Sequence, residues 1–358
     1  MTTPGFAIPV VTSPLHRGHS PRVEVACGRP MPAFDVVARM QSVLDALTPD
    51  SRFELTPPRQ DLTVAAQIER VHDVKLVEFL RRAWDEIESP DDGVDLIFAD
   101  TFSHTGFHAP TKPAKSVTDA AAMGLYCFDT ITGIGPNTYA AAIGSVVTAL
   151  TAAERTVGGS DLTLALCRPP GHHVTVDAFG GGCYLNNAAI SAQWLRDHGA
   201  DRVAVVDLDF HHGNGTQAIF YDRADVLYTS LHGHPDRSYP YFTGYADETG
   251  TGQGLGANLN LPFEAGVDGR IYGGLVERAL SAVEEHRPDF VVVSLGFDTY
   301  CDDPAGDAAL QTDDYRDVGK LFSELDVPVL ALLEGGYSVP QLGANVRAWS
   351  TGAAGLGE

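Results

Sequence analysis

The chain has 358 residues, and 47 acidic side chains against 24 Lys and Arg give it a formal net charge of −23. Hydrophobic residues make up 44% and charged residues 20%, which is too apolar and too weakly charged for a disordered chain. Such an acidic protein is repelled by nucleic-acid phosphates and anionic lipids, and its apolar runs fall short of the roughly 20 residues that span a bilayer. We expect a globular protein with neither a nucleic-acid nor a membrane partner.

The N-terminus and the cysteines bear on cellular location. The opening stretch MTTPGFAIPVVTSPLHRGH has no basic start and is interrupted by proline, so it does not resemble a secretory signal. The five cysteines are far apart and form no CxxC pair, which argues against a disulfide framework or a structural zinc cluster. We therefore expect reduced thiols in a cytoplasmic protein.

The first third of the chain predicts little regular structure. Residues 1–30 are rich in Pro and Gly and are expected to form an irregular segment, and residues 89–118 to form a long polar loop. Loops of this length are usually functional or lie at an interface. Apolar residues at helical spacing predict helices over residues 35–47 and 74–87.

Strands and helices alternate in the rest of the chain. Short apolar runs predict strands at 162–167, 203–208, 226–231, 290–295 and 327–333. Amphipathic segments predict helices at 139–154, 188–198, 270–286 and 313–325. This alternation is typical of right-handed βαβ units, with a mostly parallel central sheet and helices on both faces. No linker or repeat is visible, so we expect a single α/β domain over residues 1–358.

Residues that carry chemistry follow each predicted strand. In open α/β sheets, ligands bind beyond the carboxyl ends of the strands. The strings after the five strands are RPPGHH, DFHHGNG, HGH, GFD and EGGY, and they hold six of the 13 histidines of the chain. The sequence therefore predicts a functional site at the carboxyl edge of the sheet.

Three of these residues suit a metal ion. Asp209 and His211 are two positions apart at a strand end, so both side chains can point the same way. Asp298 follows another strand and can complete the set. Two aspartates and one histidine leave a coordination position open, which is typical of a catalytic zinc site. The ion would activate water and polarise a substrate carbonyl.

Amide hydrolysis also needs groups that move protons. His172 and His173 follow a Pro-Pro-Gly turn, and each requires a partner that fixes its tautomer. Asp207 and Asn214 are the natural partners. Tyr337 follows two glycines and can donate a hydrogen bond to the oxyanion of the tetrahedral intermediate.

Six strings of this sequence together resemble the histone deacetylase and acetylpolyamine amidohydrolase superfamily, and in particular its bacterial acetylpolyamine amidohydrolases. They are RPPGHH, FGGGCYLNN, DLDFHHGNGTQ, SLHG, SLGFDT and EGGY. The resemblance implies the arginase–deacetylase fold, one zinc ion bound by Asp209, His211 and Asp298, and hydrolysis of an N-acyl amine. It also implies that His173 shuttles the proton, in a neutral pair with Asn214.

The resemblance assigns further roles. His172, paired with Asp207, is expected to act electrostatically, and Tyr337 to polarise the carbonyl. A structural potassium ion is expected beneath the zinc, and the residues that would hold it are Asp207, Asp209, His211, Ser230 and Leu231.

The resemblance also implies a substrate tunnel. Gly181 would line it, and Tyr239 is the expected opposite wall. Gly182 stands where many relatives have an aromatic residue, so the tunnel would be wider on that side. Arg39 matches an arginine of the inner channel of the family.

The sequence leaves the identity of the substrate open. Acetylpolyamine enzymes carry acidic residues where this chain has Ala120 and Ile131, although Asp129 is nearby. The candidates are an N-acetylpolyamine, an acetyl-lysine-like amine, or a secondary metabolite or longer acyl amine. A homodimer closed by the 89–118 loop is also expected.

Two other classes of protein remain as alternatives. An arginase-like site with two manganese ions needs additional aspartates, and Gly213 and Gly296 stand near the ligands instead. A non-catalytic module that binds acyl amines or proteins would be expected to lack a ligand or the tyrosine.

Overall fold

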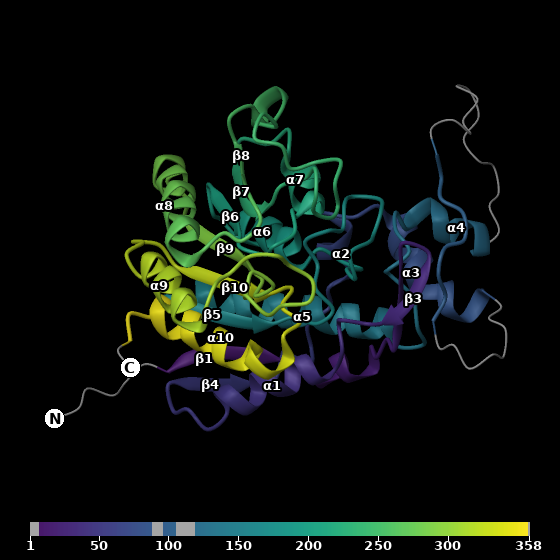
Figure 1. The fold of residues 1–358 in the computed structure, drawn as a ribbon, viewed down its shortest axis with the longest axis horizontal. Helices are drawn as coiled ribbons and strands as arrows, with labels where there is room; N and C mark the ends of the chain where they lie inside the picture. The colour runs from purple at the N-terminus through teal and green to yellow at the C-terminus, as the bar shows by residue number, and fades with distance from the viewer. Residues whose placement is uncertain (1–6, 88–95, 105–118, 357–358) are drawn as a thin grey trace.

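The structure, a computed structural model, describes residues 7–87, 96–104 and 119–356 (Figure 1). Its centre is an eight-stranded sheet in the order β4-β1-β5-β10-β9-β6-β7-β8, and all neighbouring strands in it run parallel. The strands are β1 (Ile8–Thr12), β4 (Phe53–Thr56), β5 (Leu162–Leu166), β6 (Val203–Asp207), β7 (Val226–Gly233), β8 (Asn258–Phe263), β9 (Phe290–Leu295) and β10 (Val329–Leu333).

Helices cover both faces of this sheet. They are α1 (Ala38–Leu47), α2 (Ala65–Glu69), α3 (Val74–Glu86), α4 (Asp119–Tyr126), α5 (Thr138–Val157), α6 (Asn187–Asp197), α7 (Asn214–Phe220), α8 (Gly269–His286), α9 (Thr312–Phe322) and α10 (Val339–Ala353). Buried residues of α1, α8, α9 and α10 form one hydrophobic core, and those of α2 to α7 form another. Figure 1 shows α3 and α4 at one end of the molecule, far from α8 and α9. The predicted α/β class is confirmed.

The strands contribute to both cores in alternation. In β6, Val203 and Val205 belong to the core that contains α5 and α6, whereas Ala204 and Val206 belong to the core that contains α8. All five residues of β6 are buried. Successive side chains of a strand point to opposite faces, so a sheet covered on both sides requires the continuous apolar runs from which the strands were predicted.

The expectation of an irregular segment over residues 1–30 is wrong from Ile8 onward. Strand β1 lies inside the sheet between β4 and β5. A short antiparallel pair, β2 (Val23–Ala26) and β3 (Arg29–Pro32), follows it. Proline within an apolar run argues against a strand, so β1, which contains Pro9, was not predicted from the sequence. Its pairing with β5, for example Val10 with Leu164, is a contact across the sequence that no local pattern indicates.

Other elements were missed or displaced. Strands β4 and β8 and helix α10 were not predicted, and the strand expected at 327–333 begins at Val329. The helix expected at 188–198 is α6, where the Asn186 side chain accepts a hydrogen bond from the Ala189 N–H at 2.9 Å. Gly199, which follows this helix closely, has a φ of +102°. Most of the predicted 89–118 loop lies outside the described residues.

The cysteines and helices bear on the remaining expectations about class. Cys127, Cys167 and Cys183 are buried, Cys27 is exposed and Cys301 is half-buried, all as free thiols. Within the described ranges, no helix combines the length and apolarity that crossing a membrane requires.

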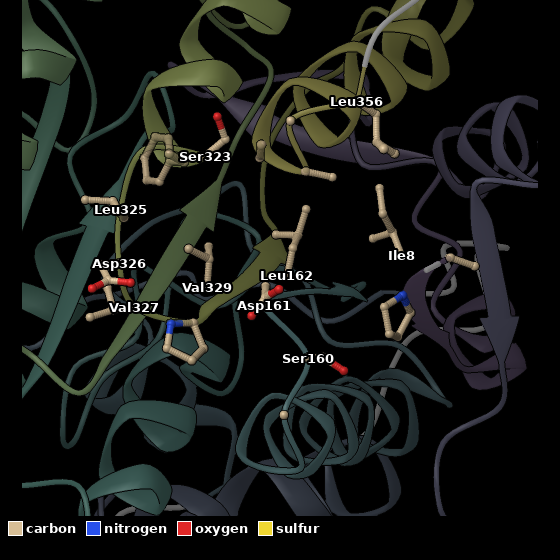
Figure 2. Close-up of a pocket in the computed structure, with 18 residues that line it drawn as sticks. Ile8, Ser160, Asp161, Leu162, Ser323, Leu325, Asp326, Val327, Val329 and Leu356 are labelled. Carbon is tan, nitrogen blue, oxygen red and sulfur yellow. The ribbon is translucent and has the colours of Figure 1, made fainter. Parts of the chain in front are cut away.

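A cavity of about 670 Å³ lies where strands begin rather than where they end. Figure 2 shows Ile8, Leu162 and Val329 around it, and these are the first residues of β1, β5 and β10. Its lining contains no histidine, cysteine or basic side chain. The cavity therefore lies at the opposite edge of the sheet from the predicted site.

Candidate active site

Four neighbouring strands deliver the candidate site residues. Their order along the sheet is β5, β10, β9 and β6. The tandem histidines follow β5, Tyr337 follows β10, Asp298 follows β9, and Asp209 and His211 follow β6. Because carboxyl ends of parallel strands share one edge, this order gathers the four loops in one place.

Asp209, His211 and Asp298 form the expected cluster. One possible ligand atom from each lies within 4.8 Å of the others. His211 Nδ1 is 3.2 Å from Asp209 Oδ1 and 2.9 Å from Asp298 Oδ2. The side chain of His211 keeps 14% of its surface exposed, against 1% and 0% for the two aspartates. Access to the cluster is therefore narrow.

The chemistry of this cluster fits a cation. Burial and the charge of Asp209 raise the pKa of Asp298 to about 7, because two buried carboxylates side by side disfavour a second negative charge. A divalent ion between them would offset that repulsion. Two carboxylates and an imidazole are donors that zinc accepts, with a position left open.

Backbone groups and glycines hold the ligands in place. The Gly335 N–H donates to Asp209 Oδ2 at 2.7 Å, and the Phe210 N–H to Asp298 Oδ1 at 2.8 Å. A Cβ atom on Gly335 would lie 2.5 Å from Asp209 Oδ2 and 2.6 Å from Asp298 Oδ2. Only glycine lets the chain after β10 approach the cluster this closely.

The same crowding bears on the arginase-like alternative. A Cβ on Gly296 would lie 2.2 Å from Asp209 Oδ2, and one on Gly213 would lie 2.1 Å from Asp207 Oδ2. Neither position has room for a further aspartate beside the cluster. The described residues therefore offer one three-residue cluster for a metal, which disfavours a site with two ions.

His172 is held between two carboxylates. Its Nδ1 is 3.1 Å from Asp207 Oδ2, and its Nε2 is 3.7 Å from Asp209 Oδ1. Burial disfavours the imidazolium, but the charges of Asp207 and Asp209 outweigh burial and raise the pKa of His172 to about 10. Asp207 also accepts a hydrogen bond from the Tyr228 hydroxyl at 3.0 Å. The two carboxylates thus favour the protonated form of His172.

His173 has the opposite character. Burial, followed by the neighbouring His172 and His211, lowers its pKa well below the ordinary value. Its Nδ1 is 2.7 Å from Asn214 Oδ1, while Asn214 Nδ2 donates to the His173 carbonyl at 3.3 Å. Since the amide nitrogen is committed to that carbonyl, Asn214 presents its oxygen to the ring. His173 therefore carries its proton on Nδ1 and keeps a free lone pair on Nε2.

Tyr337 lies above Arg39. The Arg39 guanidinium carbon is 4.7 Å from the centre of the Tyr337 ring, and the Tyr337 N–H donates to Asp303 Oδ2 at 2.6 Å. Burial raises the pKa of Tyr337 well above its ordinary value, Arg39 opposes the increase, and Asp209 and Asp298 add to it. The hydroxyl is thus protonated at neutral pH and within electrostatic range of the cluster.

The three predicted tunnel residues lie near the histidines. The Tyr239 ring meets the His173 ring edge-on, with centroids 5.0 Å apart. A Cβ on Gly181 would lie 2.1 Å from His173 Cδ2, so this position must be glycine. Gly182 has a φ of +71° and open space on its Cβ side, consistent with the missing aromatic wall.

The residues expected around potassium come from adjacent strands. Asp207 of β6 is in register with Ser230 of β7, and Leu231 follows it, fully buried. The Ser230 hydroxyl is 2.7 Å from His232 Nδ1. A potassium ion at this point remains a prediction.

Ala120 is exposed and Ile131 is half-buried, and neither side chain supplies a charge. The nearby carboxylate of Asp129 is instead bonded to protein groups, including the Tyr239 hydroxyl at 2.6 Å.

The sequence reasoning missed a buried ion-pair network that links the loops of the site. Asp35 Oδ1 accepts hydrogen bonds from Arg39 Nη1 at 2.5 Å and from Arg168 Nε at 2.9 Å. Arg39 also donates to the carbonyls of Glu334 and Gly336, both at 2.6 Å. Asp35 lies four residues before Arg39, a helical spacing for an ion pair, which was the available signal.

The sequence reasoning also gave no role to Glu334. Its Oε2 accepts hydrogen bonds from the N–H groups of Gly171 at 2.7 Å and His172 at 3.3 Å. Its Oε1 accepts one from the Ser294 hydroxyl at 3.1 Å. Burial raises the pKa of Glu334 to about 7, and the charge of His172 opposes the increase. This carboxyl group connects the loop of the tandem histidines to the loop of Tyr337.

Comparison with known proteins agrees with this geometry. The profile of the histone deacetylase domain matches residues 35–353. The acetylpolyamine amidohydrolase of Mycoplana ramosa is 37% identical over 349 residues, 97% of this chain and 99% of that protein. Acetylpolyamine amidohydrolase 2 of Pseudomonas aeruginosa is 39% identical over 333 residues, 92% and 94% of the two chains.

A solved structure gives the same result in three dimensions. The acetylpolyamine aminohydrolase from Burkholderia pseudomallei superimposes with a TM-score of 0.91 at 38% identity, covering 98% of this chain and 99% of that one. This similarity confirms the expected arginase–deacetylase fold, and the relatives confirm the expected class of enzyme, a hydrolase of amide bonds. The chain therefore belongs to the histone deacetylase family.

Proposed function

We propose that this protein is a zinc-dependent deacetylase whose substrate is an N-acetylated alkylamine of the acetylpolyamine type. The observation that carries the proposal is the cluster of Asp209, His211 and Asp298 beside two histidines with opposite proton affinities. The two relatives named above are acetylpolyamine amidohydrolases, which supports the substrate class.

Each residue of the site has a role in this proposal. A bound zinc ion supplies a charge that polarises the substrate carbonyl and makes water more acidic. His173 takes the proton of the attacking water at Nε2 and delivers it to the leaving amine. His172, positively charged, stabilises the negative charge that develops on the tetrahedral intermediate. Tyr337 donates its hydroxyl hydrogen to the same oxygen.

The other predicted components complete the proposal. A potassium ion held by Asp207, Ser230, Leu231 and the backbone of the cluster would stabilise the loop after β6. The cytoplasmic location and the homodimer remain predictions. Sedimentation at micromolar concentration tests the homodimer, and a monomer would contradict it.

The amine is the open part of the substrate. Ala120 and Ile131 offer no charge to a polyamine, and burying a cation without a partner is unfavourable. The overall charge of −23 still concentrates cationic amines near the surface. Acetyl-lysine-like amines and amines with longer acyl chains are the alternatives.

A substrate panel tests the proposal. The zinc-loaded enzyme is assayed with N-acetylputrescine, N-acetylspermidine, an acetyl-lysine peptide and butanoyl or octanoyl amides of the same amines. We expect the highest kcat/KM on the acetylated polyamines. A preference for longer acyl chains would favour the metabolite alternative, and no hydrolysis of any amide would contradict the proposed activity and favour the binding module.

A further inference from the structure

The carboxylate of Asp129 holds two walls of the approach to the metal cluster at once. Its Oδ2 accepts hydrogen bonds from the Tyr239 hydroxyl and from the Gly181 N–H, both at 2.6 Å. Its Oδ1 accepts hydrogen bonds from the N–H groups of Ile131 at 3.1 Å and Thr132 at 3.0 Å. A carboxylate has about four acceptor positions, so these protein donors fill them.

The same segment of chain also fixes the neighbouring glycine. The Thr132 hydroxyl accepts a hydrogen bond from the Gly182 N–H at 2.8 Å. Gly181 and Gly182 carry no side chains that could pack against a neighbour, and both have a positive φ. The place of this wall therefore depends on backbone hydrogen bonds to Asp129 and Thr132 rather than on side-chain packing.

The opposite wall depends on the same carboxylate. The Tyr239 ring stands edge-on to His173 at 5.0 Å and lies 6.1 Å from the His211 ring, centroid to centroid. His211 is the cluster residue that keeps appreciable exposure. A substrate that reaches the cluster beside His211 therefore passes Tyr239, whose hydroxyl is tied to Asp129.

We propose that Asp129 is a positioning residue that sets the width of the passage to the metal cluster by tying Tyr239 to the Gly181 backbone. The inference rests on the proposed deacetylase function. The inference also specifies the substrate class: the substrate should carry an unbranched alkyl chain next to the reacting amide. We expect a wall held in place to disfavour branched or ring-bearing chains on the Tyr239 side of the passage.

This role differs from that of a direct ligand for the amine. All four acceptor positions of Asp129 are used by the protein, so binding an ammonium group would require breaking one of those hydrogen bonds. The charge-assisted bonds to Tyr239 and Gly181 are the stronger class of hydrogen bond. A wall held by them is rigid.

The substitution Tyr239→Phe tests the proposal. It keeps the ring and removes only the hydroxyl. The matched control is Tyr241→Phe, because Tyr241 lies two residues away, 48% exposed, with no protein partner for its hydroxyl among the described residues. The measured quantity is the ratio of kcat/KM for a linear N-acetylalkylamine to that for its analogue branched at the carbon next to nitrogen.

We expect Tyr239→Phe to lower this linear-to-branched ratio about tenfold, since losing one charge-assisted hydrogen bond is worth at least that factor. Tyr241→Phe should leave the ratio unchanged. An unchanged ratio in Tyr239→Phe, or an equal change in both variants, would overturn the proposal.

A second variant separates the two possible roles of Asp129. Asp129→Asn keeps the size of the side chain but places an NH₂ group against N–H donors. We expect Asp129→Asn to lower the linear-to-branched ratio. The double variant Asp129→Asn/Tyr239→Phe should lower this ratio no further than Asp129→Asn alone, because both changes break the same hydrogen bond between Asp129 and Tyr239. Additive effects would contradict the link. A loss confined to cationic substrates, with the ratio intact, would show a direct amine ligand instead.

Binding of hydroxamates makes the test independent of turnover. Dissociation constants are compared for a linear and a tertiary-branched alkyl hydroxamate with the wild-type protein and both tyrosine variants. We expect the same fall in selectivity in Tyr239→Phe alone. If no amide is hydrolysed but this selectivity changes, the proposed activity fails while the role of Asp129 stands. If hydrolysis is normal but the selectivity is unaltered, the proposed activity stands while the role of Asp129 fails.

Discussion

Asn214 presents its side-chain oxygen, 2.7 Å away, to Nδ1 of His173. The pair is neutral, because Asn214 carries an amide rather than a carboxylate. Burial and the neighbouring His172 and His211 hold the pKa of His173 low, although the hydrogen bond to Asn214 and the charge of Asp209 oppose the decrease. Nε2 therefore stays unprotonated, as a general base requires, even in mildly acidic solution.

The substitution Asn214→Asp tests the consequence of that neutrality. A carboxylate beside Nδ1 stabilises the imidazolium, so the pKa of His173 should rise. The fraction of neutral base then falls at acidic pH, and the acidic limb of the kcat/KM profile should move to higher pH. The pH dependence of kcat/KM for wild type and variant measures the shift. An acidic limb that stays in place or moves to lower pH would show that His173 is not the titrating base.

Removing His173 or the Tyr337 hydroxyl should abolish most of the turnover. We expect His173→Ala and Tyr337→Phe to lower kcat by about 10² to 10⁴, the usual range for a general acid–base group or an oxyanion donor. The matched control is His234→Ala, since His234 also follows a strand but contacts Tyr245 and Asp236 instead of the cluster. Circular dichroism checks the fold, and near-normal kcat in either site variant contradicts its role.

Metal removal should stop the reaction reversibly. Dialysis against a chelator is expected to abolish hydrolysis, and one equivalent of zinc per chain to restore it. Asp298→Asn should lower zinc affinity, because it removes one of two charged donors. Isothermal titration with zinc measures that affinity without depending on turnover. Full activity in metal-free protein, verified by elemental analysis, is the opposing result.

Asp35→Asn should destabilise the fold. Burial raises the pKa of Asp35, but Arg168 and Arg39 outweigh burial and hold it at about 2. Removing one member of such a buried network leaves uncompensated charge, which typically costs about 3–5 kcal/mol. Chemical denaturation measures the change. The control Asp61→Asn breaks an exposed pair with Arg59 and should have little effect, so equal losses in both variants would argue against the network.

His72 should make stability depend on pH. Its Nδ1 is 2.8 Å from the Thr175 carbonyl, while its Nε2 accepts the Asn186 N–H at 2.9 Å. Burial lowers its pKa from 6.5 to about 4, and protonating Nε2 would set two donors against each other. The unfolded chain then takes up a proton that the folded chain refuses, so stability should fall by about 3 kcal/mol between pH 6.5 and 4.

The variant His72→Gln checks that expectation. Glutamine does not titrate, so the free energy of unfolding should fall less steeply as the pH drops from 6.5 to 4. Urea denaturation at pH 7, 5.5 and 4.5 gives the comparison, and the slope, not the absolute stability, is the quantity of interest. Identical slopes for the two proteins would assign the acid sensitivity to other groups.

Local sequence patterns predicted the grouping of Asp209, His211 and Asp298. The strands β5, β6, β9 and β10 are continuous apolar runs, and each is followed at once by residues that carry chemistry. Because a parallel sheet collects the carboxyl ends of its strands at one edge, Asp209, His211 and Asp298 could be grouped before their distances were known. The fold class followed from the same alternation of strands and helices.

Other features depend on contacts between distant parts of the chain. Strand β1 is stabilised by its neighbours β4 and β5 despite Pro9, and the partners of Asp35 lie 4 and 133 residues along the chain. The Asp129–Tyr239 hydrogen bond spans 110 residues. Such contacts are selected by packing and by the need to satisfy buried polar groups, which no short window of sequence contains.

The sequence by itself determined which side chains end the strands and hence the class of chemistry, because hydrophobic period and residue type are local properties. Only the tertiary structure decided that β10 lies between β5 and β9, that Glu334 joins the loops after β5 and β10, and that Asp129 is occupied by protein donors. The physical reason is that strand order and hydrogen-bond partners are fixed when all buried surfaces and polar groups are satisfied together.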